Sequence, residues 1–194
     1  MFASKNKGKI TEVIEIFRPK SINILSLLGL DFPIIIENGL TFEANAKIKA
    51  ETVFDALRVP VISDDSGLEL EQLDGHPGVF SARYAGEYAS DHENNEKLLN
   101  DLKNFGEPHF AKYVCAAVYY DGVNYFSAFG EIKGKIVEKG RGINGFGYDP
   151  YFIPLGYELT MAELNLNEKN IISHRAKAFK ELIKIIINRN LYEK

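Results

Sequence analysis

Apolar residues recur at helical spacing near the start of the chain and after several candidate capping residues. In the first twenty residues, apolar side chains at positions i, i+3, i+4 and i+7 form one stripe: Ile10, Val13, Ile14 and Phe17. Pro19 follows and is expected to end this helix. Further helical stretches begin after Thr41, Ser90 and Ser173, and Glu93 completes a capping box with Ser90. The pattern therefore predicts a helix near each end of the chain and two between them.

Short runs rich in β-branched and aromatic residues lie between these helices and predict strands. The pair Asp121-Gly122 divides the two longest runs, which is typical of a β-hairpin. A buried strand is expected to run into a loop at 64–67. We expect strands at residues 22–28, 33–36, 60–63, 68–70, 110–120, 123–137 and 151–153. Because a long hairpin accompanies the helix–strand units, the predicted fold class is α/β (mixed α+β), with helices flanking a mixed sheet.

Length and composition are those of a globular protein. The 194 residues suit a single domain over residues 1–194, and the one cysteine, Cys115, lies in an apolar run where we expect it to be buried. No signal peptide or apolar run long enough for a membrane span is apparent, so we expect a cytoplasmic protein without a membrane partner. The net charge of −4 argues against nonspecific nucleic-acid binding.

A basic segment leads into the first predicted helix and is a candidate anion site. It consists of Ser4, Lys5, Asn6, Lys7, Gly8 and Lys9. A helix N-terminus offers unpaired N–H groups and a partial positive charge, and Gly8 would let a ligand approach the backbone. The spacing is not that of a Walker A loop, and alone the segment also fits a plain basic turn. Both chain ends are basic and the middle is acidic, which suits an anionic ligand held with a metal cation, although charge alone favours solvated helix faces.

Acidic residues gather in two segments of the acidic middle. Asp64 and Asp65 follow an apolar strand. Glu37 lies in a loop before the helix that Thr41 is expected to cap. Within that helix, Lys49 comes four residues after Asn45. Mg²⁺ is usually held by one or two carboxylates together with substrate phosphates, and such an aspartate can also accept a proton from water. As an isolated tetrapeptide, Asp-Asp-Ser-Gly is also a common turn.

Aromatic and basic residues near the C-terminal end suggest a site for a nucleobase. Phe146, Gly147, Tyr148 and Asp149 form an aromatic loop, and aromatic faces stack on bases. Lys169, His174 and Arg175 lie before or at the start of the last predicted helix, where cations oppose the helix dipole unless they face a ligand. An aromatic turn and a solvated helix cap explain the two segments equally well.

Taken together and in order, these segments strongly resemble the inosine/xanthosine triphosphate pyrophosphatase family. The matching segments are S-K-N-K-G-K at 4–9, E-N-G-L-T-F-E-A-N-A-K-I-K-A at 37–50, I-S-D-D-S-G-L-E-L at 62–70, L-D-G-H-P-G-V-F-S-A-R-Y-A-G at 73–86, F-G-Y-D-P-Y-F-I-P at 146–154 and E-K-N-I-I-S-H-R-A-K-A at 168–178. They span nearly the whole chain in family order. The family's first loop usually has threonine and glycine where this chain has Ser4 and Lys5, which leaves the hydroxyl but changes the backbone at position 5.

The resemblance implies an elongated mixed sheet in two lobes, a nucleotide cleft between them, and usually a homodimer. It implies Mg²⁺-dependent cleavage of ITP, dITP or XTP between the α and β phosphates. By family position, Asp65 is the expected general base and, with Glu37, a magnesium ligand. The triphosphate is assigned to residues 4–9 and Lys49, and a further substrate contact to Ser66. Base and sugar recognition is assigned to Phe146, Gly147, Tyr148, Asp149, Lys169, His174 and Arg175.

Arg175 is the expected donor to an oxygen at position 6 of the base, which would disfavour adenine. Three other functions are kept open: a related pyrophosphatase acting on pyrimidine or modified triphosphates, a nucleotide sensor without turnover, and a single-stranded nucleic-acid binder. The pair Asp64 and Asp65 argues against the sensor, and the net charge argues against the nucleic-acid binder.

Overall fold

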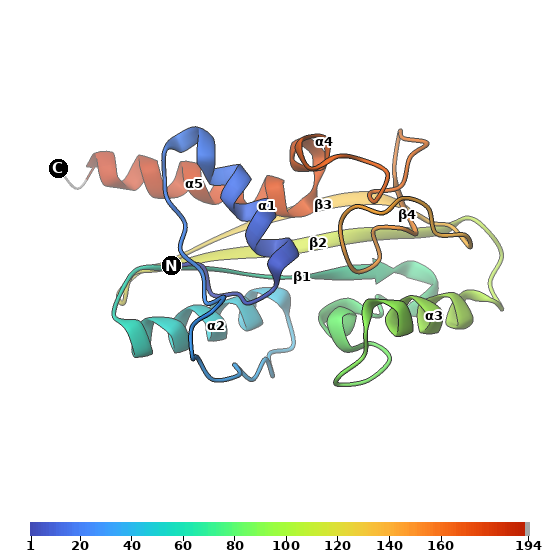
Figure 1. Cartoon of the computed structure of the whole chain (residues 1–194), viewed down its shortest axis with the longest axis horizontal. Helices are drawn as coiled ribbons and strands as arrows, with labels where there is room; N and C mark the ends of the chain where they lie inside the picture. Colours follow the sequence, from blue (N-terminus) through green and yellow to red (C-terminus); the bar gives the residue numbers. More distant parts are fainter. Residues whose placement is uncertain (193–194) are drawn as a thin grey trace. The chain divides into compact units, whose positions relative to one another are not determined.

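The computed structural model describes residues 1–192, with side chains through residue 188. Its α-helices are α1 (Lys7–Phe17), α2 (Phe42–Leu57), α3 (Asp91–Leu102), α4 (Leu166–Ile172) and α5 (His174–Tyr192) (Figure 1). Its strands are β1 (Val61–Leu70), β2 (His109–Tyr120), β3 (Tyr125–Ile136) and β4 (Phe152–Pro154). Short 3-10 helices are η1 (Arg18–Lys20), η2 (Glu71–Leu73) and η3 (Gly78–Arg83).

The four strands form one sheet in the order β1-β2-β3-β4, in which β3 and β4 are antiparallel. Phe2 adds parallel bridges to Ser26 and Ile62, so the pairing is mixed and the predicted α/β class is confirmed. The chain divides into two compact units, and the divisions fall within β1, β2 and β3. Unit 1 contains residues 1–65, 115–130 and the chain from 174 onward, and unit 2 contains residues 66–114 and 131–173.

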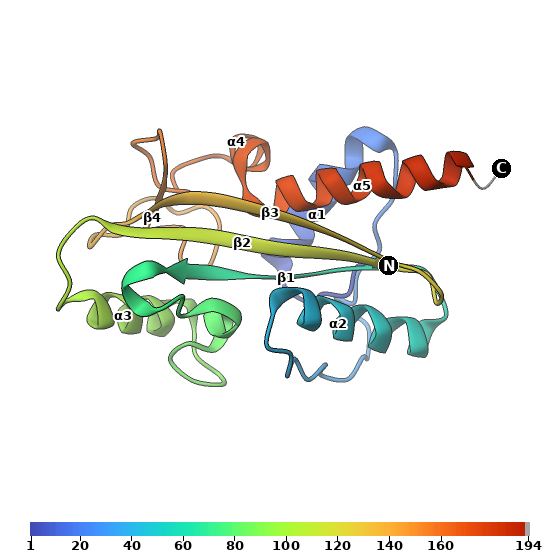
Figure 2. The same cartoon turned by 180° about the vertical axis from the view of Figure 1, so that it is seen from behind.

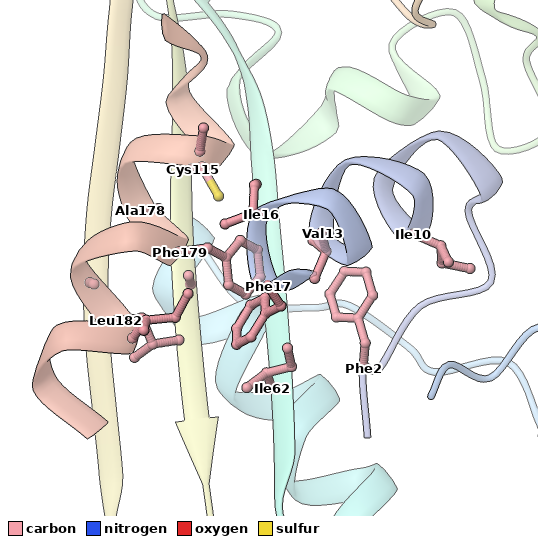
Figure 3. Close-up of a cluster of buried hydrophobic side chains, with 14 residues drawn as sticks. Phe2, Ile10, Val13, Ile16, Phe17, Ile62, Cys115, Ala178, Phe179 and Leu182 are labelled. Carbon is pink, nitrogen blue, oxygen red and sulfur yellow. The ribbon is translucent and has the colours of Figure 1, made fainter. Parts of the chain in front are cut away.

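In unit 1, helices pack on both faces of the sheet. Helices α1 and α5 lie on one face and α2 on the other, as both views show (Figures 1 and 2). A buried cluster that includes Phe2, Val13 and Phe179 packs α1 and α5 against the first face (Figure 3). The ring centroids of Phe2 and Phe179 are 5.9 Å apart. A second cluster packs α2 against the opposite face: Ala3, Leu27, Phe32, Ala46, Ala50, Val53, Val61 and Val118.

Unit 2 has its own core around α3, β4 and the remaining parts of the long strands. The buried side chains of this core include Leu98, Tyr113, Phe152 and Met161. The rings of Tyr113 and Phe152 have centroids 4.7 Å apart. Aromatic contacts at this distance add to the stabilisation that burial of the rings provides.

Residues 64–67 do not form the predicted loop, because β1 continues through them from Val61 to Leu70. The turn prediction rested on the local preference of Asp-Asp-Ser-Gly, whereas these residues continue a strand that is paired within the sheet. Successive side chains of a strand point to opposite faces, so Asp64 and Asp65 face different helices. A loop would have left both carboxylates free to turn toward the same side.

The two strands predicted at 22–28 and 33–36 are also wrong. Only Ser26 makes a bridge, with Phe2, and the remaining residues of both runs have no strand structure. Apart from Leu27, which is buried in the cluster that packs α2, their apolar side chains are partly or largely exposed, with Ile34 at 91% and Ile36 at 76%, so neither run supplies a continuous buried face to a sheet. β-branched composition alone does not specify a strand when no packed face is available.

The capping signals at Thr41 and Ser90 and the turn signal at Asp121 are confirmed. Thr41 accepts from the N–H of Ala44 at the start of α2, and Ser90 with Glu93 forms the capping box of α3. The turn at Asp121 joins β2 to β3, although β3 begins at Tyr125 and not at 123. Among the described helices, none combines the length and apolar character that crossing a bilayer requires.

Candidate active site

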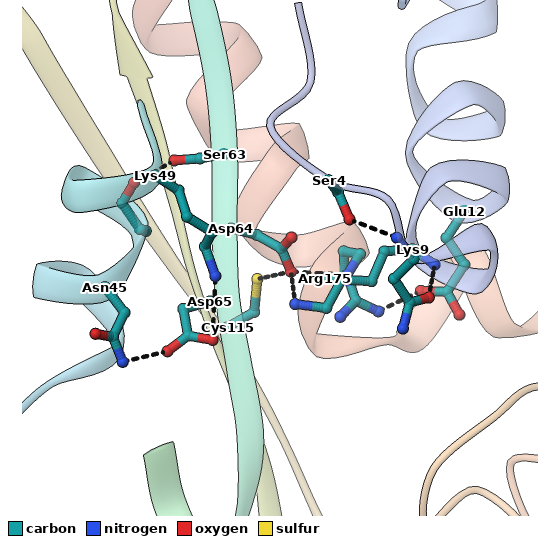
Figure 4. A network of polar contacts seen from close by, with 12 residues as sticks. Ser4, Lys9, Glu12, Asn45, Lys49, Ser63, Asp64, Asp65, Cys115 and Arg175 are labelled. Carbon is teal, nitrogen blue, oxygen red and sulfur yellow. Dashed lines mark hydrogen bonds and ion pairs between the residues drawn. The ribbon is translucent and has the colours of Figure 1, made fainter. Parts of the chain in front are cut away.

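Strand β1 sorts the polar groups of unit 1 onto two faces. Val61, Ser63 and Asp65 face α2, since Val61 packs with that helix and the Ser63 hydroxyl donates to the Ala46 carbonyl at 2.6 Å. Ile62 and Asp64 face α1 and α5. Figure 4 shows the two aspartates pointing toward these different partners. The adjacent carboxylates are therefore held in different surroundings.

Asp64 lies in a buried ionic cluster with groups from α1 and α5. Lys9 Nζ is 3.3 Å from its Oδ2, and Arg175 Nε donates to the same oxygen at 3.0 Å. Arg175 Nη1 donates to Glu12 Oε2 at 2.6 Å. Burial favours a raised pKa for Asp64, but Lys9 and Arg175 outweigh it and hold that pKa well below the ordinary value. Asp64 is therefore ionised at neutral pH.

Asp65 lies on the α2 side, where Lys49 links it to Glu37, the other predicted metal ligand. Lys49 Nζ pairs with Glu37 Oε2 and lies 3.5 Å from Asp65 Oδ1, while Asn45 Nδ2 donates to Asp65 Oδ2 at 3.0 Å. Burial favours a lowered pKa for Lys49, but Asp65 and Glu37 outweigh it and raise the pKa. The side chain of Asp65 is 10% exposed and that of Asp64 is 1% exposed. Asp65 is thus the more accessible of the two carboxylates.

The basic segment at 4–9 forms the N-terminus of α1, with Lys7 and Gly8 already in the helix. Asn6 is the N-cap and accepts from the N–H of Lys9 at 3.0 Å, while the Ser4 hydroxyl oxygen accepts from the N–H of Asn6 at 3.1 Å. Lys5 Nζ donates to the Phe32 carbonyl at 2.6 Å. The lysine that replaces the family glycine therefore ties this segment to the loop before α2.

Unit 2 contains a second buried ion pair, between two residues that the sequence assigned to base recognition. Lys169 Nζ donates to Asp149 Oδ2 at 2.5 Å, and the same oxygen accepts from the N–H of Phe146 at 2.9 Å. The Lys169 ammonium lies 4.8 Å from the centroid of the Phe146 ring. Tyr113 donates to the other Asp149 oxygen at 3.3 Å. These contacts bring Phe146, Asp149 and Lys169 together in one cluster.

The two middle residues of the aromatic loop anchor it to unit 2. Tyr148 is buried, and its hydroxyl donates to the Ser81 carbonyl at 2.8 Å. Gly147 donates its N–H to Asp91 and accepts from Asn95 through its carbonyl, at 2.7 and 2.9 Å. Tyr148 therefore packs in the core of this unit, which leaves Phe146 as the aromatic ring of the loop that contacts the ion pair.

The structure thus brings together Glu37, Lys49 and Asp65 on one face of β1, and Lys9 and Arg175 on the other. Arg175 is buried and donates to two carboxylates, so its predicted role at position 6 of the base remains a prediction. His174 is buried at the start of α5, and Ser66 follows Asp65 along β1.

No role was predicted from the sequence for Asn45 and Glu12, which contact residues of the clusters in unit 1. Asn45 contacts Asp65, and its signal was the spacing of four residues to Lys49, which places both on one face of α2. Glu12 contacts Arg175, and its signal was an acid beside the apolar stripe of α1. An acidic residue in such a position is buried only when it is paired.

Comparison with known proteins agrees with the resemblance seen in the sequence. The chain is 47% identical over 189 residues to the dITP/XTP pyrophosphatase of Bacillus subtilis strain 168, covering 96% of each chain. It resembles the solved Ham1 protein of Staphylococcus aureus, at 40% identity and a TM-score of 0.83 over 97% of each chain. A solved HAM1 protein of Coxiella burnetii is 36% identical with a TM-score of 0.85, over 96% of this chain and 97% of that one. The model of the Ham1 family matches residues 1–185, and the protein belongs to that family.

Proposed function

We propose that this protein hydrolyses the non-standard purine nucleoside triphosphates ITP, dITP and XTP to the monophosphate and pyrophosphate. The observation that carries the proposal is the grouping of Asp65, Glu37 and Lys49 on one face of β1, in a chain similar to relatives named dITP/XTP pyrophosphatases. A carboxylate base beside an ammonium group suits the attack of water on an anionic phosphate linkage.

The donor set fits a magnesium ion that also binds the substrate. Within residues 1–192, no group of three His, Cys, Asp or Glu side chains is arranged to hold a metal. Glu37 and Asp65 both contact Lys49, so their carboxylates already share one cation. Mg²⁺ commonly takes one or two carboxylates, with water and phosphate oxygens completing its coordination. We assign Glu37 and Asp65 as its ligands, and the bound ion would neutralise charge on the triphosphate.

In the proposed mechanism Asp65 accepts the proton, and nearby basic groups bind the phosphates. In the proposed reaction, the oxygen of a water molecule bonds to phosphorus as Asp65 accepts one of its protons. The anhydride bond between the α and β phosphates breaks, and pyrophosphate leaves. Lys49 would stabilise the charge that develops on the phosphate oxygens, and the N-terminus of α1 with Lys7 and Lys9 would bind the triphosphate.

Base recognition is assigned to Phe146 and the Asp149–Lys169 pair. The Phe146 ring offers a face for stacking, and the ion pair offers charged groups to the polar edge of the base. We further propose that both units belong to one catalytic domain, that two copies form a homodimer, and that the enzyme acts in the cytoplasm. The family model supports the first point, because it spans residues of both units.

The test is release of pyrophosphate from ITP, XTP, dITP, ATP, GTP and dTTP, with and without Mg²⁺. Metal-dependent release from ITP, XTP and dITP, with little from the other three, is the expected result. Release chiefly from dTTP would favour the pyrimidine alternative. If no triphosphate is hydrolysed but ITP binds, the protein is a sensor and the proposal is wrong.

A further inference from the structure

Asn45 is a fully buried amide in the second turn of α2, and both ends of its side chain are engaged. Its Oδ1 accepts from the N–H of Gly39 at 2.7 Å, and its Nδ2 donates to Asp65 Oδ2 at 3.0 Å. We propose that Asn45 is a positioning residue that fixes the orientation of the Asp65 carboxylate, with Gly39 as its anchor. The proposal rests on the catalytic role proposed above for Asp65.

The two hydrogen bonds permit only one orientation of the amide. A backbone N–H can only donate and an ionised carboxylate can only accept. If the amide turned over, Nδ2 would face the N–H of Gly39 and Oδ1 would face the Asp65 carboxylate, so both contacts would be repulsive. The Gly39 N–H therefore compels Asn45 to present a donor to Asp65.

Gly39 is required at this position because there is no room for a side chain. A Cβ on Gly39 would lie 2.7 Å from Asn45 Oδ1 and 2.8 Å from the Ala44 Cβ, and both distances are shorter than side chains tolerate. Gly39 is not among the residues with positive φ, so conformation alone would permit another residue. The absence of a side chain lets the N–H of Gly39 approach the amide closely.

Asp65 is consequently held through both of its oxygens. Asn45 binds Oδ2, and Lys49, one turn later on α2, lies 3.5 Å from Oδ1. Two successive turns of one helix thus set the plane of the carboxylate. A misplacement of about 1 Å in a reacting group can lower a rate about 100-fold. Loss of Asn45 should therefore affect turnover more than substrate binding.

The first test compares Asn45→Ala and Asn45→Asp with the wild-type protein, using ITP and Mg²⁺. We expect kcat to fall at least about tenfold in Asn45→Ala, within the roughly 100-fold cost of a misplaced group, while KM changes less than about threefold. Asn45→Asp should lose more turnover than Asn45→Ala although it is closer in shape, because it presents an acceptor to Asp65. If Asn45 only filled space, Asn45→Ala would lose more turnover than Asn45→Asp, and that result would overturn the proposal.

Gly39→Ala provides a variant that removes no polar group. Gly106→Ala is its matched control, because Gly106 also lacks a positive φ and a Cβ there would meet nothing within 4 Å. We expect Gly39→Ala to lower kcat as Asn45→Ala does and Gly106→Ala to leave kcat unchanged. Equal kcat values in Gly39→Ala and the wild type would contradict the anchoring role.

A measurement without turnover separates this proposal from the proposed function. In ¹⁵N-labelled protein, the side-chain amide signals of Asn45, identified by their loss in Asn45→Ala, should exchange slowly with solvent. They should shift and exchange faster in both Asp65→Ala and Gly39→Ala, and not in Gly106→Ala. Insensitivity to Asp65→Ala would overturn the positioning role even in an active enzyme. The expected shifts in a protein that hydrolyses no triphosphate would instead refute the proposed function alone.

Discussion

Arg175 donates from Nε to Oδ2 of Asp64 at 3.0 Å, and both side chains are buried. Asp65, the next residue along β1, instead contacts Asn45 and Lys49. The same substitution at the two aspartates should therefore have different effects. Asp64→Asn should lower the free energy of unfolding by about 3–5 kcal/mol, because it leaves Arg175 buried with one charged partner fewer.

Asp65→Asn should retain the fold and ITP binding but lower turnover by about 100- to 10,000-fold, because it removes the proton acceptor. Urea denaturation and steady-state kinetics on both variants measure the contrast. If Asp64→Asn abolished turnover without loss of stability while Asp65→Asn remained active, the roles assigned to the two aspartates would be reversed.

The depressed pKa of Asp64 predicts a loss of stability in acid. A carboxyl with a folded-state pKa below its unfolded value contributes stability above the unfolded pKa, and this contribution disappears as pH falls through the folded pKa. The decline should begin near the ordinary aspartate pKa of about 4 and continue below it. Chemical denaturation at pH values from 7 downward measures this change. Asp64→Asn should show a shallower decline, and an equally steep decline would assign the acid sensitivity to other carboxyls.

Lys49 and Lys47 offer a matched pair on α2. Lys49 contacts both Glu37 and Asp65, whereas Lys47 pairs with Glu43 at 2.8 Å and its side chain is 39% exposed. Lys49→Met should lower kcat/KM for ITP by about 100- to 1,000-fold, the usual loss for one electrostatic stabiliser. Lys47→Met should change it less than about twofold, since exposed pairs contribute little. Similar losses in both variants would point to a nonspecific effect of charge on α2.

Gly145, which precedes the aromatic loop, and Gly147, which lies within it, test the Asp149 cluster in unit 2. Gly145 and Gly147 both have positive φ, at 75° and 62°, but a Cβ at Gly145 would lie 2.1 Å from Asp149 Oδ2 and one at Gly147 would meet nothing within 4 Å. Alanine strains the backbone at both positions, and only Gly145→Ala also displaces Asp149. Gly145→Ala should therefore unfold at a lower temperature than Gly147→Ala and discriminate less between ITP and ATP. Equal melting temperatures of Gly145→Ala and Gly147→Ala would show that displacing Asp149 does not lower the stability of the fold.

Local signals predicted the starts of helices and the hairpin because their causes lie within a few residues. Thr41 and Ser90 cap the helices they precede, and Asp121 forms the predicted turn. The loop predicted at 64–67 is wrong because these residues pair with a neighbouring strand of the sheet, and local preference does not report such pairing. The surroundings of the Asp64 side chain likewise include Arg175, which is 111 residues later in the chain.

The candidate site was predicted in its components but not in its arrangement. Residue type and family resemblance predicted that Glu37, Lys49 and Asp65 belong to one site, and the structure places them in contact through Lys49. The contact between Glu12 and Arg175 joins residues 163 positions apart, and no periodicity in the sequence encodes such a pairing. The role of Asn45 became visible only when its two hydrogen-bond partners were known.

The central claim is cleavage of ITP between the α and β phosphates, and the most direct measurement is ³¹P NMR of the products formed with Mg²⁺. We expect signals of IMP and pyrophosphate in equal amounts, and at least about 100-fold slower formation of both products with Asp65→Asn. Formation of IDP and orthophosphate, or undiminished cleavage by Asp65→Asn, would contradict it.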